Sequence, residues 1–195
     1  MADIASIYIE RGRAFLDAAD TLIAAKATTA DASYHPLATL LLFSIEISLK
    51  AALLSKGVPA KKGHEIDRYL IDATAVGLPV SEEIAAGVFG LAEPYRLHGP
   101  RYAPIERATI SMPPIAIMRD LASCIVDLCA TLINGGNYQT PFQPLTGAEA
   151  EALRDRVAAA YQAQVDAFDP SRVYTEQDKP DIPLGMRTIT KVSRP

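Results

Sequence analysis

The segment from His35 to Lys56 restricts most strongly what this chain can fold into. It reads HPLATLLLFSIEISLKAALLSK, and apolar or small side chains occupy nearly every face of a helix drawn through it. Pro36 suits a first helical position and Gly57 suits a C-terminal cap. A helix that is apolar almost all round is a buried one. We therefore expect this segment to be the central helix of a helical core.

Two charged residues, Glu46 and Lys50, interrupt this segment at mid-span between Leu37 and Leu54. Charges are costly at bilayer depth, so the sequence predicts a buried helix of a soluble protein rather than a membrane span. Charged residues at positions 10, 11 and 13 also stand where a secretory signal would need an unbroken apolar run. We expect a cytoplasmic protein.

Apolar residues at three- and four-residue spacing predict further helices on both sides of the central one. These helices span about 3–26, 63–77, 81–92, 115–134 and 146–168. Ser81 is the expected N-cap of one of them, and Thr146 with Glu149 forms the capping box of another. The segment 93–114 contains five prolines, and we expect it to be a long irregular loop.

The predicted fold class is all-α. We expect residues 1–168 to form an antiparallel up-and-down bundle of four or five main helices, and residues 169–195 to form a tail or arm. Only Met186–Val192, in that tail, has strand character. Within the central helix, Ser44, Ser48 and Ala52 recur at four-residue spacing, and such a strip of small side chains lets another helix approach closely.

Glu46 and Lys50 are the first candidate for a functional site. They lie one turn apart on one helix face, together with Thr39 and Phe43. A buried unpaired charge is very costly, so each must be paired or must reach a wet cleft. One interpretation is a purely structural ion pair, with Lys50 reaching solvent at the helix end. The other is a functional polar pocket.

His64 follows Gly63 at or beside a predicted helix start and is the second candidate. A helix N-terminus disfavours an imidazolium, so a neutral histidine there could accept a hydrogen bond or act as a general base. The alternative is a capping or loop histidine bonded to nearby backbone or to a tyrosine. The three histidines stand about thirty residues apart, without the spacing of a metal site, so we expect neither a metal nor a cofactor.

The third candidate is a cluster in the proline-rich segment. Three arginines, a histidine and two tyrosines could grip phosphate and stack a base, although these arginines could equally pair with acids across a helix interface. The members are Tyr95, Arg96, His98, Arg101, Tyr102 and Arg107. The net charge of −4 gives no global basic field, so any RNA contact must come from such a local cluster.

The run SIEISLKAALLSKG, followed by GHEIDRYL and VGLP, resembles the HEPN superfamily (higher eukaryotes and prokaryotes nucleotide-binding). The resemblance covers roughly residues 14–132 and is carried by Glu46, Lys50, Gly63, His64, Arg101 and Tyr102. It implies a helical bundle that commonly dimerises through helix faces. Family members include metal-independent ribonucleases, toxins paired with nucleotidyltransferase antitoxins, and non-catalytic relatives that bind RNA or nucleotides.

The ribonuclease members of that superfamily carry an arginine followed, after four to six residues, by a histidine. No arginine in this chain has a histidine at that distance, since His98 follows Arg96 by only two positions. No catalytic residue can therefore be assigned. We expect a HEPN-like homodimer that lacks ribonuclease activity and binds RNA or a nucleotide, or that acts in a toxin–antitoxin or defence-type complex with a nucleotidyltransferase-like partner. The alternatives are a structural or partner-binding helical module and a divergent metal-independent ribonuclease.

Overall fold

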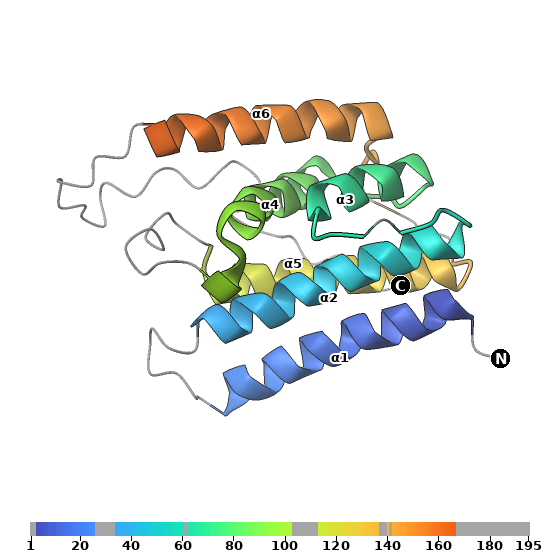
Figure 1. Ribbon diagram of the computed structural model, residues 1–195. Helices are drawn as coiled ribbons and strands as arrows, with labels where there is room; N and C mark the ends of the chain where they lie inside the picture. Colours follow the sequence, from blue (N-terminus) through green and yellow to red (C-terminus); the bar gives the residue numbers. More distant parts are fainter. Residues whose placement is uncertain are drawn as a thin grey trace.

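The computed structural model describes residues 3–25, 34–60, 62–102, 113–136, 140 and 142–166, and every regular element in these ranges is an α-helix. This confirms the all-α prediction. The helices are α1 (Ile4–Ala24), α2 (Tyr34–Ser55), α3 (Ile66–Ala75), α4 (Glu82–Tyr102), α5 (Ile115–Ile133) and α6 (Gly147–Asp166) (Figure 1). The predicted tail, with its strand-like segment, lies outside the described residues.

The predicted central helix, α2, contacts α1, α3, α4 and α5. In Figure 1 the helices are stacked in layers, with α1 at the bottom, α2 and α5 above it, then α3 and α4, and α6 at the top. Within α2, the stretch Pro36–Ser55 is long and apolar enough to cross a membrane, but 67% of its apolar window is buried inside the protein. Contacts with four other helices account for the apolar character of α2.

The close contact between α1 and α2 depends on small residues, as the four-residue strip in α2 predicts. The backbone of α1 at Gly12 lies against Ser44 and Ser48, and the Ser44 hydroxyl donates a hydrogen bond of 2.8 Å to the Gly12 carbonyl. A methyl group at Gly12 would collide with the Ser48 hydroxyl. Glycine at this position therefore lets the two helices pack this closely without displacing the Ser48 hydroxyl.

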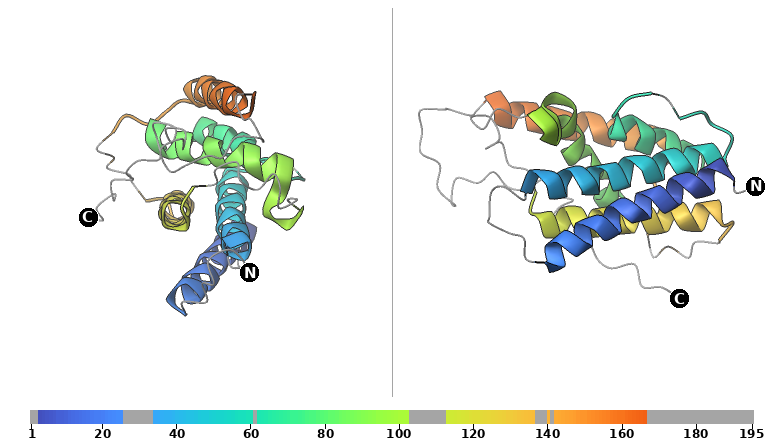
Figure 2. Two further views of the ribbon diagram at one scale, coloured as in Figure 1. Left: turned by 90° about the vertical axis from the view of Figure 1, so that its left-hand side faces the viewer. Right: turned by 60° about the horizontal axis from the view of Figure 1, so that its bottom comes forward.

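Neighbouring helices in the sequence form antiparallel pairs, α1 with α2 and α3 with α4, whereas α2 and α5 lie side by side in the same direction (Figures 1 and 2). The caps predicted at Ser81 and at Thr146 with Glu149 are confirmed, whereas α2 begins at Tyr34, two residues before the predicted first position at Pro36. Thr146 and Glu149 exchange hydrogen bonds as a capping box, and the Ser81 hydroxyl accepts a hydrogen bond from the Ile84 backbone.

The structure corrects the prediction of an irregular loop over 93–114, because α4 continues to Tyr102. The helix bends in its C-terminal part, as both views of Figure 2 show. Prolines at positions 94 and 100 lack the amide hydrogen that an inner helical residue donates, and a helix that continues through proline is kinked rather than ended. Residues 103–112, with Arg107, lie outside the described residues.

Candidate functional site

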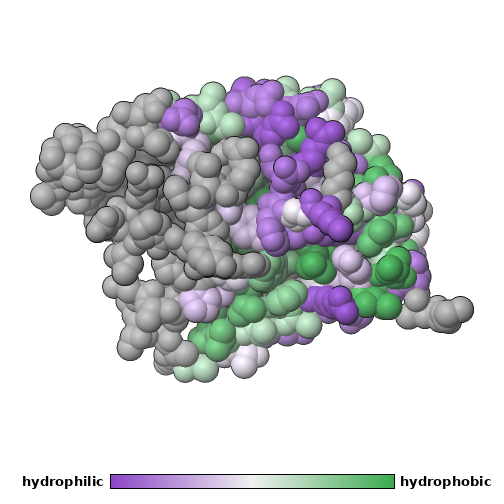
Figure 3. Space-filling model, in the orientation of Figure 1, coloured by the Kyte–Doolittle hydropathy of each residue, from purple (hydrophilic) through white to green (hydrophobic). Residues whose placement is uncertain are grey.

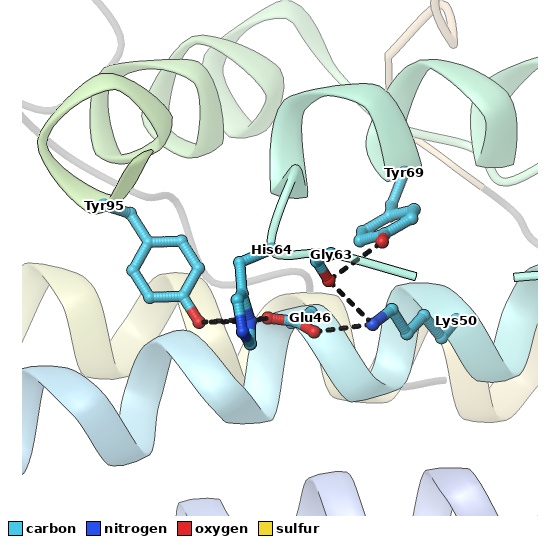
Figure 4. A network of polar contacts seen from close by, with 6 residues as sticks. All are labelled: Glu46, Lys50, Gly63, His64, Tyr69 and Tyr95. Carbon is cyan, nitrogen blue, oxygen red and sulfur yellow. Dashed lines mark hydrogen bonds and ion pairs between the residues drawn. The ribbon is translucent and has the colours of Figure 1, made fainter. Parts of the chain in front are cut away.

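Glu46 is a buried carboxylate in the middle of α2, with its side chain only 3% exposed. Its Oε1 accepts a hydrogen bond of 2.7 Å from the Lys50 ammonium one turn further along the helix. Its Oε2 lies 2.9 Å from Nδ1 of His64 and accepts a bond of 3.0 Å from the Tyr95 hydroxyl (Figure 4). Three donors from three parts of the chain thus satisfy both oxygens of one carboxylate, as a buried charge requires.

His64 stands in the loop between α2 and α3, two residues before α3 begins. In contrast to Glu46, its side chain is 55% exposed. The ring lies edge-on to Tyr95, with the centroids 5.9 Å apart, and is tilted against Phe43 at 6.2 Å. Nδ1 therefore reaches the buried carboxylate while about half of the ring faces outward. The structure thus brings together the first and second sequence candidates, Glu46 with Lys50 and His64.

Lys50 has a second role, because its ammonium also donates a bond of 3.0 Å to the backbone carbonyl of Gly63, next to His64. The Tyr69 hydroxyl donates to the same carbonyl at 3.0 Å, and the Lys50 ammonium sits 4.8 Å from the centre of the Tyr69 ring. Gly63 has a φ of 126°, a conformation that side-chain-bearing residues rarely adopt. The loop before His64 is thus fixed by two hydrogen bonds to a single carbonyl.

Burial of the Lys50 ammonium acts to lower its pKa, but the hydrogen bond and charge of Glu46 outweigh that effect, so the pKa lies above its usual value. Burial also raises the pKa of Tyr69, against the opposing charge of Lys50. Both groups consequently keep their protons near neutral pH. Lys50 serves as a fixed cation and Tyr69 as a hydrogen-bond donor, and neither is suited to act as a base.

Sequence reasoning assigned no role at Glu46 to Tyr69 or Tyr95. Tyr95 is predicted only as an aromatic ring in the proline-rich cluster, and Tyr69 is not among the sequence candidates. A signal was present, since a buried tyrosine usually finds a partner for its hydroxyl. Tyr69 is 1% and Tyr95 6% exposed. The partner of each tyrosine hydroxyl depends on how α3 and α4 cross α2. Helix periodicity in the sequence does not contain that information.

Four of the predicted site residues, Arg96, His98, Arg101 and Tyr102, belong to the C-terminal part of α4. Their side chains lie outside the described part of the structure. In the described ranges, no group of three or more histidine, cysteine, aspartate or glutamate side chains is arranged to hold a metal ion.

Comparison of the chain with protein-family models, with curated proteins and with solved structures found no match in any of the three. The chemistry of the site therefore follows from its own residues. They form a network in which a buried carboxylate orients an accessible imidazole, while a lysine and a tyrosine fix the backbone beside it. Such an imidazole can donate a hydrogen bond to a ligand, accept one from it, or exchange a proton with it.

Proposed function

We propose that this chain is a HEPN-like helical domain that binds RNA or a nucleotide at the network around Glu46. The observation that carries the proposal is the exposed imidazole of His64, whose Nδ1 is held by a carboxylate that is itself buried. A structural ion pair would need only Glu46 and Lys50. It would not need an exposed histidine as a third member.

The residues behind the HEPN resemblance support this proposal. Glu46, Lys50, Gly63 and His64 come from two short motifs that are separated in the sequence, and all four take part in one set of hydrogen bonds (Figure 4). If the two motifs resembled the family only by chance, nothing would require their residues to bond to one another. Their meeting supports the interpretation of the two motifs as a single site.

The position of α4 supports a phosphate-bearing ligand. Tyr95 of α4 joins the network, and the chain carries arginine one and six positions later in the same helix. At 1.5 Å per residue, the backbone of these positions lies within about 9 Å of Tyr95 along the helix axis. A local basic segment of this kind can attract phosphate despite the net charge of −4.

The test is fluorescence anisotropy with a short labelled single-stranded RNA at low ionic strength, together with calorimetric titration of nucleotides. We expect His64→Ala, Arg96→Ala and Arg101→Ala each to weaken binding by about tenfold or more, the effect of losing one charge-assisted hydrogen bond. Arg13→Ala is the matched control, because Arg13 is an exposed α1 residue and its one ion pair with a described residue is with Glu10. Absence of RNA and nucleotide binding by the wild-type protein at low ionic strength would refute the proposal.

A divergent metal-independent ribonuclease is the second candidate, and the contact between Glu46 and His64 favours it. A carboxylate that holds Nδ1 orients the imidazole so that a neutral Nε2 could take the proton of a ribose hydroxyl. RNA incubated with the protein in the presence of a chelator tests this candidate. Cleavage lost in His64→Ala would support it, whereas equal cleavage by wild type, His64→Ala and His98→Ala would identify a contaminating nuclease.

A partner-binding role has an observation of its own on α1. In the described part of the chain, the large apolar side chains that are exposed all lie on this helix, namely Ile4, Ile7, Leu22 and Ile23. Figure 3 shows apolar surface along the lower edge of the molecule, where α1 lies in Figure 1. A second copy of the chain would give the homodimer that the HEPN resemblance implies. Sedimentation of wild type and Ile7→Gln over a range of concentrations tests it, and a wild-type monomer throughout would exclude it.

A further inference from the structure

The position of one hydrogen on His64 follows from the contact with Glu46. An ionised carboxylate only accepts hydrogen bonds, so the nitrogen that lies 2.9 Å from it must carry a hydrogen. Nδ1 is therefore a donor in both protonation states of the ring. The only variable site is Nε2, which makes no hydrogen bond to any residue that the structure describes.

The state of Nε2 determines which ligand group it can bind. In the neutral ring it carries a lone pair and accepts a hydrogen bond, for instance from a ribose hydroxyl. In the protonated ring it carries a hydrogen and donates one. The non-bridging oxygens of a phosphodiester only accept hydrogen bonds, so they can bind His64 only when its ring is protonated.

Charged and titratable groups reach His64 from each element packed against it. Glu46 and Lys50 approach it from α2, Tyr69 from α3 and Tyr95 from α4, and Glu65 is its neighbour in the loop. The charges of Glu46 and Lys50 cancel as a pair. Lys50 is already engaged by the Glu46 carboxylate, the carbonyl of the preceding loop and a tyrosine ring. Among the side chains of this hydrogen-bonded network, the imidazolium is thus the cation that can face a ligand, and the exposed Lys62 stands two residues before it in the loop.

We propose that His64 binds a phosphate group of the ligand in its protonated form. Nε2–H donates to a non-bridging phosphate oxygen while Nδ1–H remains bonded to Glu46. The imidazolium then lies between two anions, with a charge-assisted hydrogen bond to each. This inference rests on the proposed function and specifies which group of the RNA or nucleotide the site recognises. It predicts that binding takes up a proton.

A ligand that takes up one proton binds more tightly as the pH falls, by as much as about tenfold per pH unit where the free histidine is neutral. We therefore expect the affinity for a short oligouridylate to rise between about pH 8 and about pH 5.5. Neither its phosphodiesters nor its bases titrate in this range. Calorimetry in two buffers of different ionisation enthalpy measures the protons taken up, and the number should approach one at the alkaline end of the range.

His64→Gln is the decisive variant, because its amide can still donate a hydrogen bond but does not titrate. It should bind at a nearly constant, weaker affinity over the whole range and take up no proton. Because the wild-type side chain is half exposed, the variant should fold normally, which circular dichroism checks. Uridine, which lacks the phosphate, is the ligand control and should show no such pH dependence.

The possible results separate this inference from the proposed function. Binding that is independent of pH, or a His64→Gln variant that keeps the full pH dependence, would overturn the proton-linked contact and leave RNA binding intact. Affinity that rises with pH would also overturn it, since Nε2 would then act as an acceptor from a hydroxyl. Absence of binding at every pH would overturn the proposed function and this inference together.

Discussion

Removing one member of the Glu46–Lys50 pair should strongly lower the free energy of unfolding. Removing both should lower it by much less than the sum of the two single losses. The two side chains are 3% and 12% exposed, so either charge left alone would be nearly buried. Breaking a buried ion pair on one side typically costs about 3–5 kcal/mol. The lower end of this range applies here, because the remaining charge keeps other partners. Lys50 alone would still bind the Gly63 carbonyl, and Glu46 alone would still bind His64 and Tyr95.

We therefore expect Glu46→Gln and Lys50→Met each to lower the free energy of unfolding by about 3 kcal/mol. The double variant should lose about 3–4 kcal/mol rather than about 6, because it leaves no uncompensated buried charge, which gives a coupling energy of about 2–3 kcal/mol. Urea unfolding followed by circular dichroism measures all four proteins, with unchanged dependence on urea as the check for two-state behaviour.

The surface pair of Glu10 and Arg13 provides a matched control. Their side chains are 69% and 45% exposed, so the same substitutions there should couple by less than about 0.5 kcal/mol. Two results would refute the claim that this pair is a buried and mutually dependent unit. One is a loss of less than about 1 kcal/mol of unfolding free energy in each single variant, and the other is a loss in the double variant that equals the sum of the two single losses.

Three further predictions concern the backbone and a surface pair. Gly63→Ala should lower the free energy of unfolding by about 1–3 kcal/mol, because a φ of 126° strains any residue with a Cβ, although that Cβ would make only an ordinary contact with the Tyr69 hydroxyl. An unchanged midpoint of urea unfolding would contradict this. Gly12→Ala should cost about 1–3 kcal/mol by pushing α1 away from Ser48, and adding Ser48→Ala should recover most of it. Asp20 accepts hydrogen bonds from Arg119, which hold its pKa below the usual value, so their contribution is present above about pH 4 and is lost as the pH falls further. Asp20→Asn should accordingly lower stability by at most about 1 kcal/mol at neutral pH, and this difference should shrink in acid.

The helical architecture could be predicted because most of its signals are local. The nearly uniform apolar character of α2 predicted a central buried helix, and the motif from Thr146 to Glu149 marked the start of α6. The end of α4 was predicted wrongly for a reason that is also physical. Proline content argues against a regular helix, but it does not indicate whether the chain will bend and continue through Pro94, as it does here.

The candidate site was predictable only in part. The pairing of Glu46 with Lys50 follows from four-residue spacing, and the small residues that face Gly12 follow from a repeat along one helix. By contrast, the contacts of Tyr69 and Tyr95 depend on how three helices cross, and on a loop that returns past α2. Spacing along a single helix contains no information on such crossings.

The cost of burying Glu46 and Lys50 is itself an argument about their role. A buried ion pair is often no more stable than two apolar side chains of the same size, and such side chains would suit the rest of α2. What the pair provides is control of one histidine. Oε2 of Glu46 holds the ring of His64, and Oε1 holds Lys50. The Lys50 ammonium in turn donates a hydrogen bond to the carbonyl of Gly63, the residue just before His64. One carboxylate thus fixes both the side chain and the backbone of the residue that we propose contacts the ligand. Tyr69→Phe, which removes one bond to that carbonyl and keeps the ring, should therefore weaken RNA binding several-fold while proton uptake stays the same. A purely structural role for Tyr69 would lower stability without changing affinity.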